Sequence, residues 1–207
     1  MPKPTYWLDL FTGTTWQEFL EAGAKVSGFR ERRWKTVQAI KPGDFLLCYL
    51  TGLSRFIGLL GVVSEPFRDD SKIWKDESFP SRVRVKPTIV LTPETAVPVQ
   101  ELRDQLSIFA DLKSPNAWTG HFRGSPARWK TPDALAVVKA LEAAKANPVV
   151  REVDPAKLGR RPKALAAKIG LVSVPGTEES GVSDTEVESE ARPHTELQAL
   201  LIRLGSN

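Results

Sequence analysis

The stretch from Val26 to Lys35, VSGFRERRWK, combines large rings with a run of arginines. Phe29 and Trp34 flank three arginines, and a single acid, Glu31, lies among them. Aromatic rings stack on unpaired bases, which contributes roughly 1–3 kcal/mol per base, and arginines beside them neutralise phosphates. We therefore expect Phe29 to stack on a base. The cations expected to hold the backbone around that base are Arg30, Arg32, Arg33 and Lys35.

Other large rings occur in predicted loops with cations nearby. Trp74 lies in DDSKIWKDESF, and Trp118 and Phe122 lie in NAWTGHFRGSP. We favour a binding role for Phe29 and Trp74. For Trp34 and Trp118, base contact and a place at the end of the core both remain open. The rings within or beside predicted regular elements are expected to be structural: Trp7, Trp16 and Trp129.

The charge of the chain is mild overall and uneven along its length. The formal net charge is +4, yet residues 112–131 contain four cations and no acid, whereas residues 177–190 contain six acids and no base. A locally basic domain favours a polyanionic partner, although an ordinary soluble surface explains the charge equally well. The candidate backbone contacts in the basic segment are Arg123, Ser125, Arg128 and Lys130.

The sequence lacks the motifs of a catalyst. There is no Walker loop, GxGxxG or GxSxG, and the two histidines, His121 and His194, have no metal-ligand spacing. Cys48 is the only cysteine, so it forms no intrachain disulfide and builds no zinc knuckle. The adjacent acids Asp69 and Asp70 are more typical of a solvated loop than of an active site. We therefore expect a binding protein without a cofactor or metal.

These side chains must be positioned by a run of short strands. Apolar strands are predicted at 6–11, 45–50, 55–67 and 81–91, with helices at 14–22 and 132–146. Glycines within the third of these strands indicate a bulge or bend, as small barrels require. The pattern predicts an α+β fold in which a small curled sheet or barrel carries helices outside it.

The composition changes after residue 147. We expect a nucleic-acid-binding domain at 1–147, a partly disordered linker at 148–190 and an amphipathic helix at 191–207. Within the linker, RRPKALAAKIG (160–170) is predicted to form one short helix. Two interpretations of the last helix stay open: it begins a further domain, or it docks back on the first.

Several segments together resemble the EVE domain, a member of the PUA-like group that includes the YTH readers of methylated RNA. The resemblance covers about residues 5–141, and its carriers are YWLDLF, KVSGFR, IKPGDFLLCYLTG, FIGLLGVVSEPFRDD, FPSRVRVKP and FRGSP. It implies a PUA-like pseudo-β-barrel of five or six strands with flanking helices. It also implies a pocket that takes one modified base swung out of its strand.

The resemblance also implies roles for residues in this pocket. Trp74 corresponds to one aromatic wall, and Phe29 corresponds to the other, where relatives commonly carry tryptophan. Asp69 or Asp70 would accept a hydrogen bond from an exocyclic amine of the base, and the backbone of Ser27 would meet the base edge.

The C-terminal segment RPHTELQALLIRLG resembles the opening helix of a PD-(D/E)XK-type nuclease domain, which follows EVE domains in some bacterial proteins. Glu196 would then belong to a first active-site helix. The metal-binding motif that should follow is absent from the sequence. We therefore do not expect this chain alone to cut nucleic acid.

Together these features predict a reader of a modified base in DNA, which flips the base and targets a modification-dependent restriction system. A nuclease domain in cis or in a partner subunit would complete that system. The N-terminus lacks the apolar core of a signal peptide, so a cytoplasmic location without membrane contact is expected. The alternatives are a reader of modified RNA, a truncated nuclease and a sensor of a free nucleoside.

Overall fold

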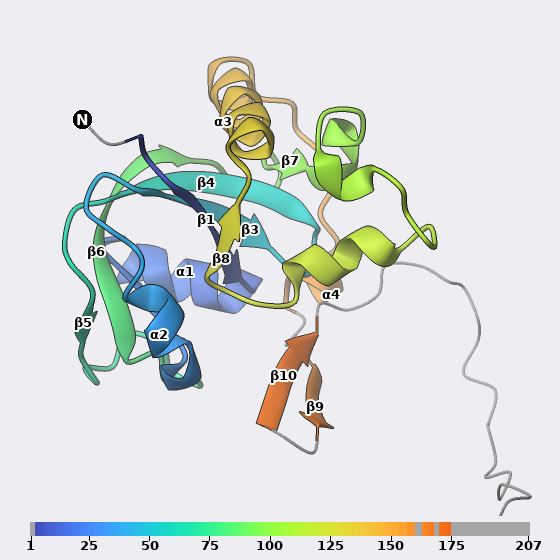
Figure 1. Cartoon of the computed structure of the whole chain (residues 1–207). Helices are drawn as coiled ribbons and strands as arrows, with labels where there is room; N and C mark the ends of the chain where they lie inside the picture. Colours follow the sequence, from blue (N-terminus) through green and yellow to red (C-terminus); the bar gives the residue numbers. More distant parts are fainter. Residues whose placement is uncertain (1–2, 160–162, 168–169, 175–207) are drawn as a thin grey trace, which may run out of the picture. The chain divides into compact units, whose positions relative to one another are not determined.

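The computed structural model describes residues 3–159, 163–167 and 170–174 of the chain (Figure 1). The chain divides into one unit of residues 1–177 and another of residues 178–207. The second unit lies outside the described residues, and with it lie the predicted C-terminal helix, Glu196 and most of the acidic linker.

The centre of the fold is a curled mixed sheet in the order β2-β6-β4-β3-β1-β8 (Figure 1). β1 (Tyr6–Phe11) runs parallel to β3 (Phe45–Leu50), and β8 (Ala127–Trp129) pairs antiparallel with the other side of β1. These strands are rich in aromatic and branched residues, which pack well in a buried sheet.

The rest of the sheet is antiparallel. β4 (Arg55–Val62) joins β3 to β6 (Ser81–Val90), and β2 (Val26–Phe29) pairs with β6. Two short strands complete it, β5 (Phe67–Arg68) on β6 and β7 (Val97–Pro98) on β4. The strand register shifts on both sides of β4, as the glycines of that strand predicted.

Helices flank the sheet as predicted. α1 (Gly13–Glu21) follows β1, and α3 (Thr131–Ala146) follows β8; the two appear on opposite sides of the sheet in Figure 1. η1 (Glu31–Arg33) and α2 (Trp34–Val37) follow β2 directly. Three short 3₁₀ helices lie between β7 and β8: η2 (Val99–Leu102), η3 (Ser107–Phe109) and η4 (Ala117–Phe122). The α+β fold predicted with five or six strands is confirmed, and the curled sheet has six main strands.

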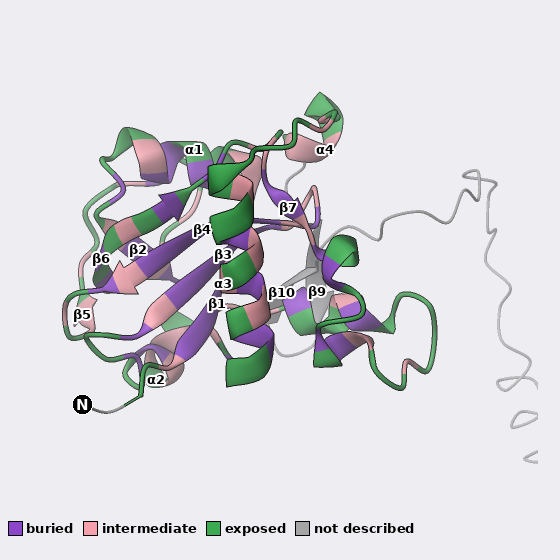
Figure 2. Cartoon of the chain, turned by 90° about the horizontal axis from the view of Figure 1, so that it is seen from above, coloured by how far each residue is buried: buried purple, intermediate pink, exposed green. Residues whose placement is uncertain are grey.

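The core lies between the sheet and its helices, and Figure 2 shows the buried residues concentrated in the central strands. Trp7, Trp16 and Trp129 are buried in this core, as expected. Gly58 makes room for the ring of Trp16, since a Cβ at residue 58 would lie 3.1 Å from it.

Asp44 explains why the turn before β3 is so well defined. Its carboxylate accepts hydrogen bonds from the Trp7 indole at 3.0 Å and from the backbone N–H groups of Thr5 and Lys41, both at 2.9 Å. The preceding Gly43 has a φ of +92°, which favours glycine. The KPGD turn therefore ties the start of β1 to the start of β3.

The first part of the predicted linker is docked on the domain. The Arg151 N–H donates to the Glu94 carbonyl at 2.9 Å, and Arg55 donates to the Glu152 carbonyl at 2.9 Å. α4 (Pro155–Leu158) then packs closely against Gly13 and Gly52. A Cβ at Gly13 would lie 2.4 Å from the Leu158 carbonyl oxygen, and a Cβ at Gly52 would lie 2.2 Å from the Lys157 carbonyl oxygen, so neither position has room for a side chain.

The helix expected over residues 160–170 is not what the structure describes there. Residues 163–167 form β9 (Lys163–Ala167), which pairs antiparallel with β10 (Gly170–Val174). The physical reason is that the backbone N–H and C=O groups of β9 pair with those of β10. A helix is therefore not needed to provide these groups with hydrogen-bond partners. In the described part of the chain, no helix has the length and apolar character needed to span a membrane.

Candidate functional site

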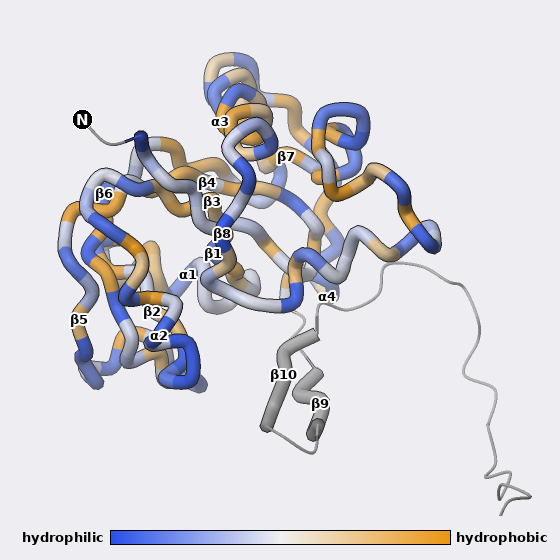
Figure 3. The backbone as a smooth tube through the Cα atoms, in the orientation of Figure 1, coloured by the Kyte–Doolittle hydropathy of each residue, from blue (hydrophilic) through white to orange (hydrophobic). Residues whose placement is uncertain are grey.

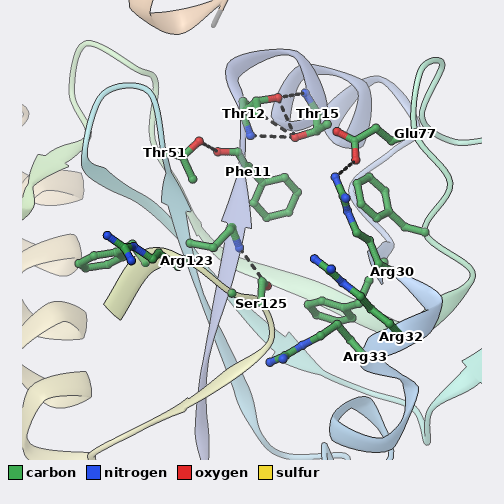
Figure 4. A pocket seen from close by; sticks show the side chains of 16 residues that line it. Phe11, Thr12, Thr15, Arg30, Arg32, Arg33, Thr51, Glu77, Arg123 and Ser125 are labelled. Atoms are coloured by element: carbon green, nitrogen blue, oxygen red, sulfur yellow. Dashed lines mark hydrogen bonds and ion pairs between the residues drawn. The ribbon is translucent and has the colours of Figure 1, made fainter. Parts of the chain in front are cut away.

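A cavity of about 380 Å³ opens between the C-terminal end of β1, the β2–η1 junction and the loop between η4 and β8 (Figure 4). Its lining brings together aromatic rings, small hydroxyl side chains and four arginines. The lining residues used below are Phe11, Phe29, Phe79, Phe122, Arg30, Arg32, Arg33, Arg123, Thr51, Glu77 and Ser125.

Phenylalanines form the apolar part of the wall. Phe11 ends β1 and is held from behind by Trp16, whose ring centroid lies 5.0 Å away. Phe122 ends η4 and stacks on Tyr49 at 4.0 Å. Phe29 ends β2. Phe11, Phe122 and Phe29 are 4%, 1% and 2% exposed, so only a small part of each ring meets the cavity. Regular elements thus fix these rings, which suits a wall that receives a flat apolar ligand.

Arginines from two distant segments line the cavity. Figure 4 shows Arg30, Arg32 and Arg33 on one side and Arg123 on the other, and the segment that leads into α2 is strongly hydrophilic in Figure 3. Arg30 pairs with Glu77 at 2.5 Å. Cations from two segments therefore border one opening, although the guanidinium of Arg123 points away from the other three in Figure 4. A basic rim of this kind favours an anionic ligand.

Only part of the Arg33 guanidinium has a hydrogen-bond partner in this arrangement. Its Nη2 donates to the Pro126 carbonyl at 2.5 Å, while its Nε is buried without a hydrogen-bond partner. Burial, and then repulsion from Arg32, lowers the pKa of Arg33. An incoming anion would relieve both effects, which makes Arg33 a natural phosphate contact.

A buried acid lies beneath the polar part of the wall. Asp9, in the middle of β1, is 2% exposed and accepts a hydrogen bond from Ser27 Oγ at 2.5 Å. Its other oxygen lies 3.3 Å from Ser125 Oγ. Burial outweighs these hydrogen bonds and raises the pKa of Asp9 to about 7. The contact between Ser27 and Asp9 also links the edge strand β2 to β1, which lies next to the opposite edge strand, β8.

The EVE domain family matches residues 5–131, more than half of the chain. The chain belongs to the EVE domain family. A UPF0310 protein of Pyrococcus abyssi is 31% identical over 136 residues, which cover 60% of this chain and 89% of that protein. A UPF0310 protein of Pyrococcus horikoshii is 26% identical over 138 residues, with the same coverage.

Solved structures with the fold of this EVE domain include YTH domains. The YTH domain of Pho92, crystallised in complex with m6A, matches with a TM-score of 0.51 at 14% identity, over 69% of this chain and 86% of that one. The YTH domain of Zygosaccharomyces rouxii MRB1, in complex with N6-methyladenosine RNA, matches with a TM-score of 0.51 at 14% identity, over 68% and 88%. At this identity the likeness establishes the shared fold, in agreement with the predicted PUA-like and YTH-like group.

The EVE domain brings six of the predicted site residues to one cavity, although they come from two segments that are distant in the sequence. Those residues are Phe29, Arg30, Arg32, Arg33, Arg123 and Ser125. Ser27 lies just behind them, fully buried, and its hydroxyl contacts Asp9 and no part of the cavity lining.

Trp74 differs from its expected position. The sequence predicts a ring that faces Phe29 across the pocket, but Trp74 is outside the cavity lining and 3% exposed. Its indole donates to the Thr15 carbonyl at 3.2 Å and packs edge-on against Phe79. The reason is Gly28, where a Cβ would lie 2.7 Å from the Trp74 ring. The missing side chain leaves a space that Trp74 fills.

The remaining predicted pocket residues also lie outside this cavity. Trp118 is buried in the core against Phe122, at a centroid distance of 5.9 Å, and Trp34 is half-buried beneath the guanidinium of Arg68 at 4.7 Å. Both rings are therefore occupied by protein neighbours.

The two predicted acids are separated from the cavity as well. Asp69 forms an ion pair with the buried Arg82 at 2.6 Å, and hydrogen bonds from Ser71 lower the pKa of Asp69. Asp70 lines a second cavity, of about 360 Å³, on which Trp74 also borders. The exposed cations Lys35, Arg128 and Lys130 are not among the cavity-lining residues.

Sequence reasoning missed Asp9 and the rings of Phe11 and Phe79. Asp9 did carry a signal, because it is an acid in the middle of the apolar strand YWLDLF. An acid in such a position is buried with partners or serves a site. Phe11 and Phe79 carried none, since rings at strand ends are common in any core.

Proposed function

We propose that this EVE domain reads a modified base in DNA by accepting one extruded base into the cavity beside Phe11 and Phe29. The observation that carries this proposal is the combination of a phenylalanine wall and arginines on both sides of one opening. A base is flat and apolar on its faces, and it is attached to phosphates on both sides. The cavity offers a complement to each of these properties.

The energetics favour a distorted or single-stranded site over an intact duplex. Extrusion of a base costs a few kcal/mol, and the cost is least where the base is already unpaired. Contact with aromatic walls returns roughly 1–3 kcal/mol per base. The arginines then add a salt-dependent contribution that carries no sequence information.

The biological setting that we propose is the targeting of a modification-dependent restriction system in the cytoplasm. The EVE domain supplies recognition, and a nuclease domain, in cis or in a partner subunit, supplies cleavage. The likeness to YTH domains solved with m6A and with N6-methyladenosine RNA supports recognition of a modified nucleotide.

The test is the binding of fluorescein-labelled DNA by the full chain, measured by fluorescence anisotropy at two salt concentrations. Plain, cytosine-methylated, hydroxymethylated and adenine-methylated duplexes of one sequence are compared. We expect one modification to bind more tightly than plain DNA at both salt concentrations. Equal affinity for all four at every salt concentration would rule out a modified-base reader of DNA.

RNA is the second candidate, because two of the YTH domains with this fold, those of Mmi1 and of Zygosaccharomyces rouxii MRB1, were solved in complex with RNA. A DNA hairpin and an RNA hairpin of the same sequence separate the two, since the 2′-hydroxyl is the group that differs. Tighter binding of the RNA hairpin, with a preference for its methylated form, would replace the DNA proposal. Heat on mixing with a free nucleoside alone would instead indicate a small-molecule sensor.

A further inference from the structure

Asp9 is placed one hydrogen bond away from the cavity. Among the ion pairs of the described residues none involves Asp9, and the hydrogen bonds to its carboxylate come from hydroxyl groups. A buried carboxylate without a cation is energetically costly, so binding of a proton competes with ionisation near neutral pH. Ser125, by contrast, is part of the cavity lining and connects Asp9 to whatever binds there.

The hydrogen bonds of Ser125 couple the protonation state of Asp9 to a ligand in the cavity. A hydroxyl has one proton to donate and two lone pairs to accept with. The Leu10 N–H donates to Ser125 Oγ at 3.2 Å and uses one lone pair. The Ser125 proton has two acceptors within reach, the Leu8 carbonyl at 3.2 Å and Asp9 Oδ1 at 3.3 Å.

The two protonation states of Asp9 leave different groups for the ligand. When Asp9 is ionised, it only accepts, so Ser125 donates to a neighbouring oxygen and keeps its second lone pair for an N–H of the ligand. Because Ser27 donates to Oδ2, a proton bound by Asp9 is carried on Oδ1, from which it is donated to Ser125 and uses that second lone pair. Ser125 then presents no free acceptor to the cavity.

We propose that Asp9, acting through Ser125, is a specificity-determining residue that selects a base with an amino group, and that it does so when it is ionised. This inference rests on the proposed function, since it assumes that a base enters the cavity. Because burial raises the pKa of Asp9 to about 7, the selection is expected to strengthen from about pH 6 to about pH 8.

The other charged groups around Asp9 do not produce the same change. Cys48 lies opposite Asp9 on β3, and burial raises the pKa of its thiol well above the ordinary value, so it stays neutral. The cavity-lining arginines keep their charge across this range. Glu77, paired with Arg30, is the acid in the lining. His121 is exposed on η4, and all test proteins therefore carry His121→Gln.

The experiment measures anisotropy with labelled single-stranded DNA in which one central base stands in an otherwise all-thymine strand. Two matched pairs are used: adenine against purine, and cytosine against 2-pyrimidinone, which differ only by the amino group. We expect the amino-bearing base of the pair that enters the cavity to bind about three- to tenfold more tightly at pH 8, as one added hydrogen bond provides. At pH 6 we expect this preference to shrink toward onefold.

Asp9→Asn and Ser125→Ala test the two residues. The Asp9→Asn side chain cannot ionise, so the preference of this variant should be the same at pH 6 and pH 8, whereas Ser125→Ala should remove the preference at both. Asp133→Asn is a matched control, because Asp133 is also buried and accepts hydrogen bonds from Ser107 at 2.7 and 2.9 Å, outside the cavity lining. It should behave as the parent protein does.

Thermal melting establishes that each variant is folded. Should Asp9→Asn not fold, the pH dependence of the parent protein and of Ser125→Ala decides the question. An amino-group preference that does not change with pH in the parent protein would overturn the role of Asp9. A parent protein that binds neither these strands nor any of the modified duplexes described above would instead count against the proposed function.

Discussion

Arg123 is the arginine of the cavity that stands apart from the others, on the loop between η4 and β8. Its side chain is exposed, so its removal should not affect folding. We expect Arg123→Ala to weaken binding of every sequence alike and to reduce the slope of log K against log salt by about 1. Titration of labelled DNA at several salt concentrations measures this.

Arg128 provides the control for Arg123, since it is exposed on the neighbouring strand β8 but lies outside the cavity lining. Arg128→Ala should leave both the affinity and the slope close to those of the parent protein. Equal losses for the two variants would mean that the basic surface as a whole binds, and that the cavity has no special part in it.

Asp9 also makes the stability of the fold depend on pH. Its folded-state pKa of about 7 is above the unfolded value, so the folded state binds more protons and stability falls as pH rises from about 4 to 7. Between pH 5 and pH 8 this amounts to at most about 3 kcal/mol. Urea unfolding of Asp9→Asn should lack this part of the decrease, and an unchanged decrease would contradict it.

At the scale of single residues, four of the seven predicted cations line the cavity, while Lys35, Arg128 and Lys130 lie outside its lining. Phe29, Arg30, Arg32 and Arg33 are close neighbours in sequence, and Arg123 and Ser125 were suggested by their own basic loop. The position of Trp74 depends on the space that Gly28 leaves empty, which is a property of packing. No local sequence pattern indicates that the space beside a glycine will be filled by an aromatic ring from a distant loop.

Among the elements, the segment between β5 and β6 differs most from its predicted role. It was expected to supply one wall of the base pocket, and it contributes to the packing of the fold instead. Arg82 anchors it through Asp69 and Ser71, and Trp74 within it contacts both α1 and β2. We expect Trp74→Ala to lower the free energy of unfolding by about 3–5 kcal/mol, as for other buried aromatic residues. Gly28→Ala should also destabilise the fold, by about 1–3 kcal/mol, because it forces the same ring to move.

Chemical unfolding of these two variants, followed by circular dichroism, measures both effects. Gly120→Ala is the control, since a Cβ there meets nothing within 4 Å. A stable Trp74→Ala protein that has lost only its preference for a modified base would contradict the structural role and restore the expected base contact.

The docking of α4 is a second property that belongs to an element. A Cβ added at Gly52 would lie 2.2 Å from the Lys157 carbonyl, so Gly52→Ala should dislodge α4. We expect faster tryptic cleavage after Lys157 in this variant, observed by mass spectrometry over a time course. Gly120→Ala again serves as the comparison, and identical cleavage rates would show that α4 tolerates the added methyl group.

The longer strands, the two main helices and the fold class were predictable because hydrophobic periodicity and the KPGD turn act locally, whereas the order of the strands in the sheet was not predicted. The docked segment at 148–159 was not predicted, since its contacts combine backbone groups, two glycines and the side chains of Arg55 and Arg151. Polar composition suggested a linker there, and composition does not report hydrogen bonds between distant carbonyl and N–H groups. The β9–β10 pair was missed for the same reason, as its alanines and lysines favour a helix when no partner strand is considered.

For the whole molecule, charge distribution matters more than net charge. If the four arginines of the cavity each contact one phosphate of duplex DNA, a plot of the logarithm of the association constant against the logarithm of the salt concentration should have a slope of about −3.6. Fluorescence anisotropy between low and moderate salt gives this slope directly. A slope near zero would mean that the net charge of +4 is merely a soluble surface and that phosphates are not the partner.

The cavity wall is built from phenylalanines, while the tryptophans lie behind it in the core or on other surfaces. A ligand that enters therefore touches no indole directly. Intrinsic emission excited at indole wavelengths should follow unfolding closely and respond weakly to occupancy. The same separation leaves the opening free for an engineered fluorescent reporter. At Gly124 a Cβ meets nothing within 4 Å, so the indole of a Gly124→Trp variant should change its fluorescence when a base binds.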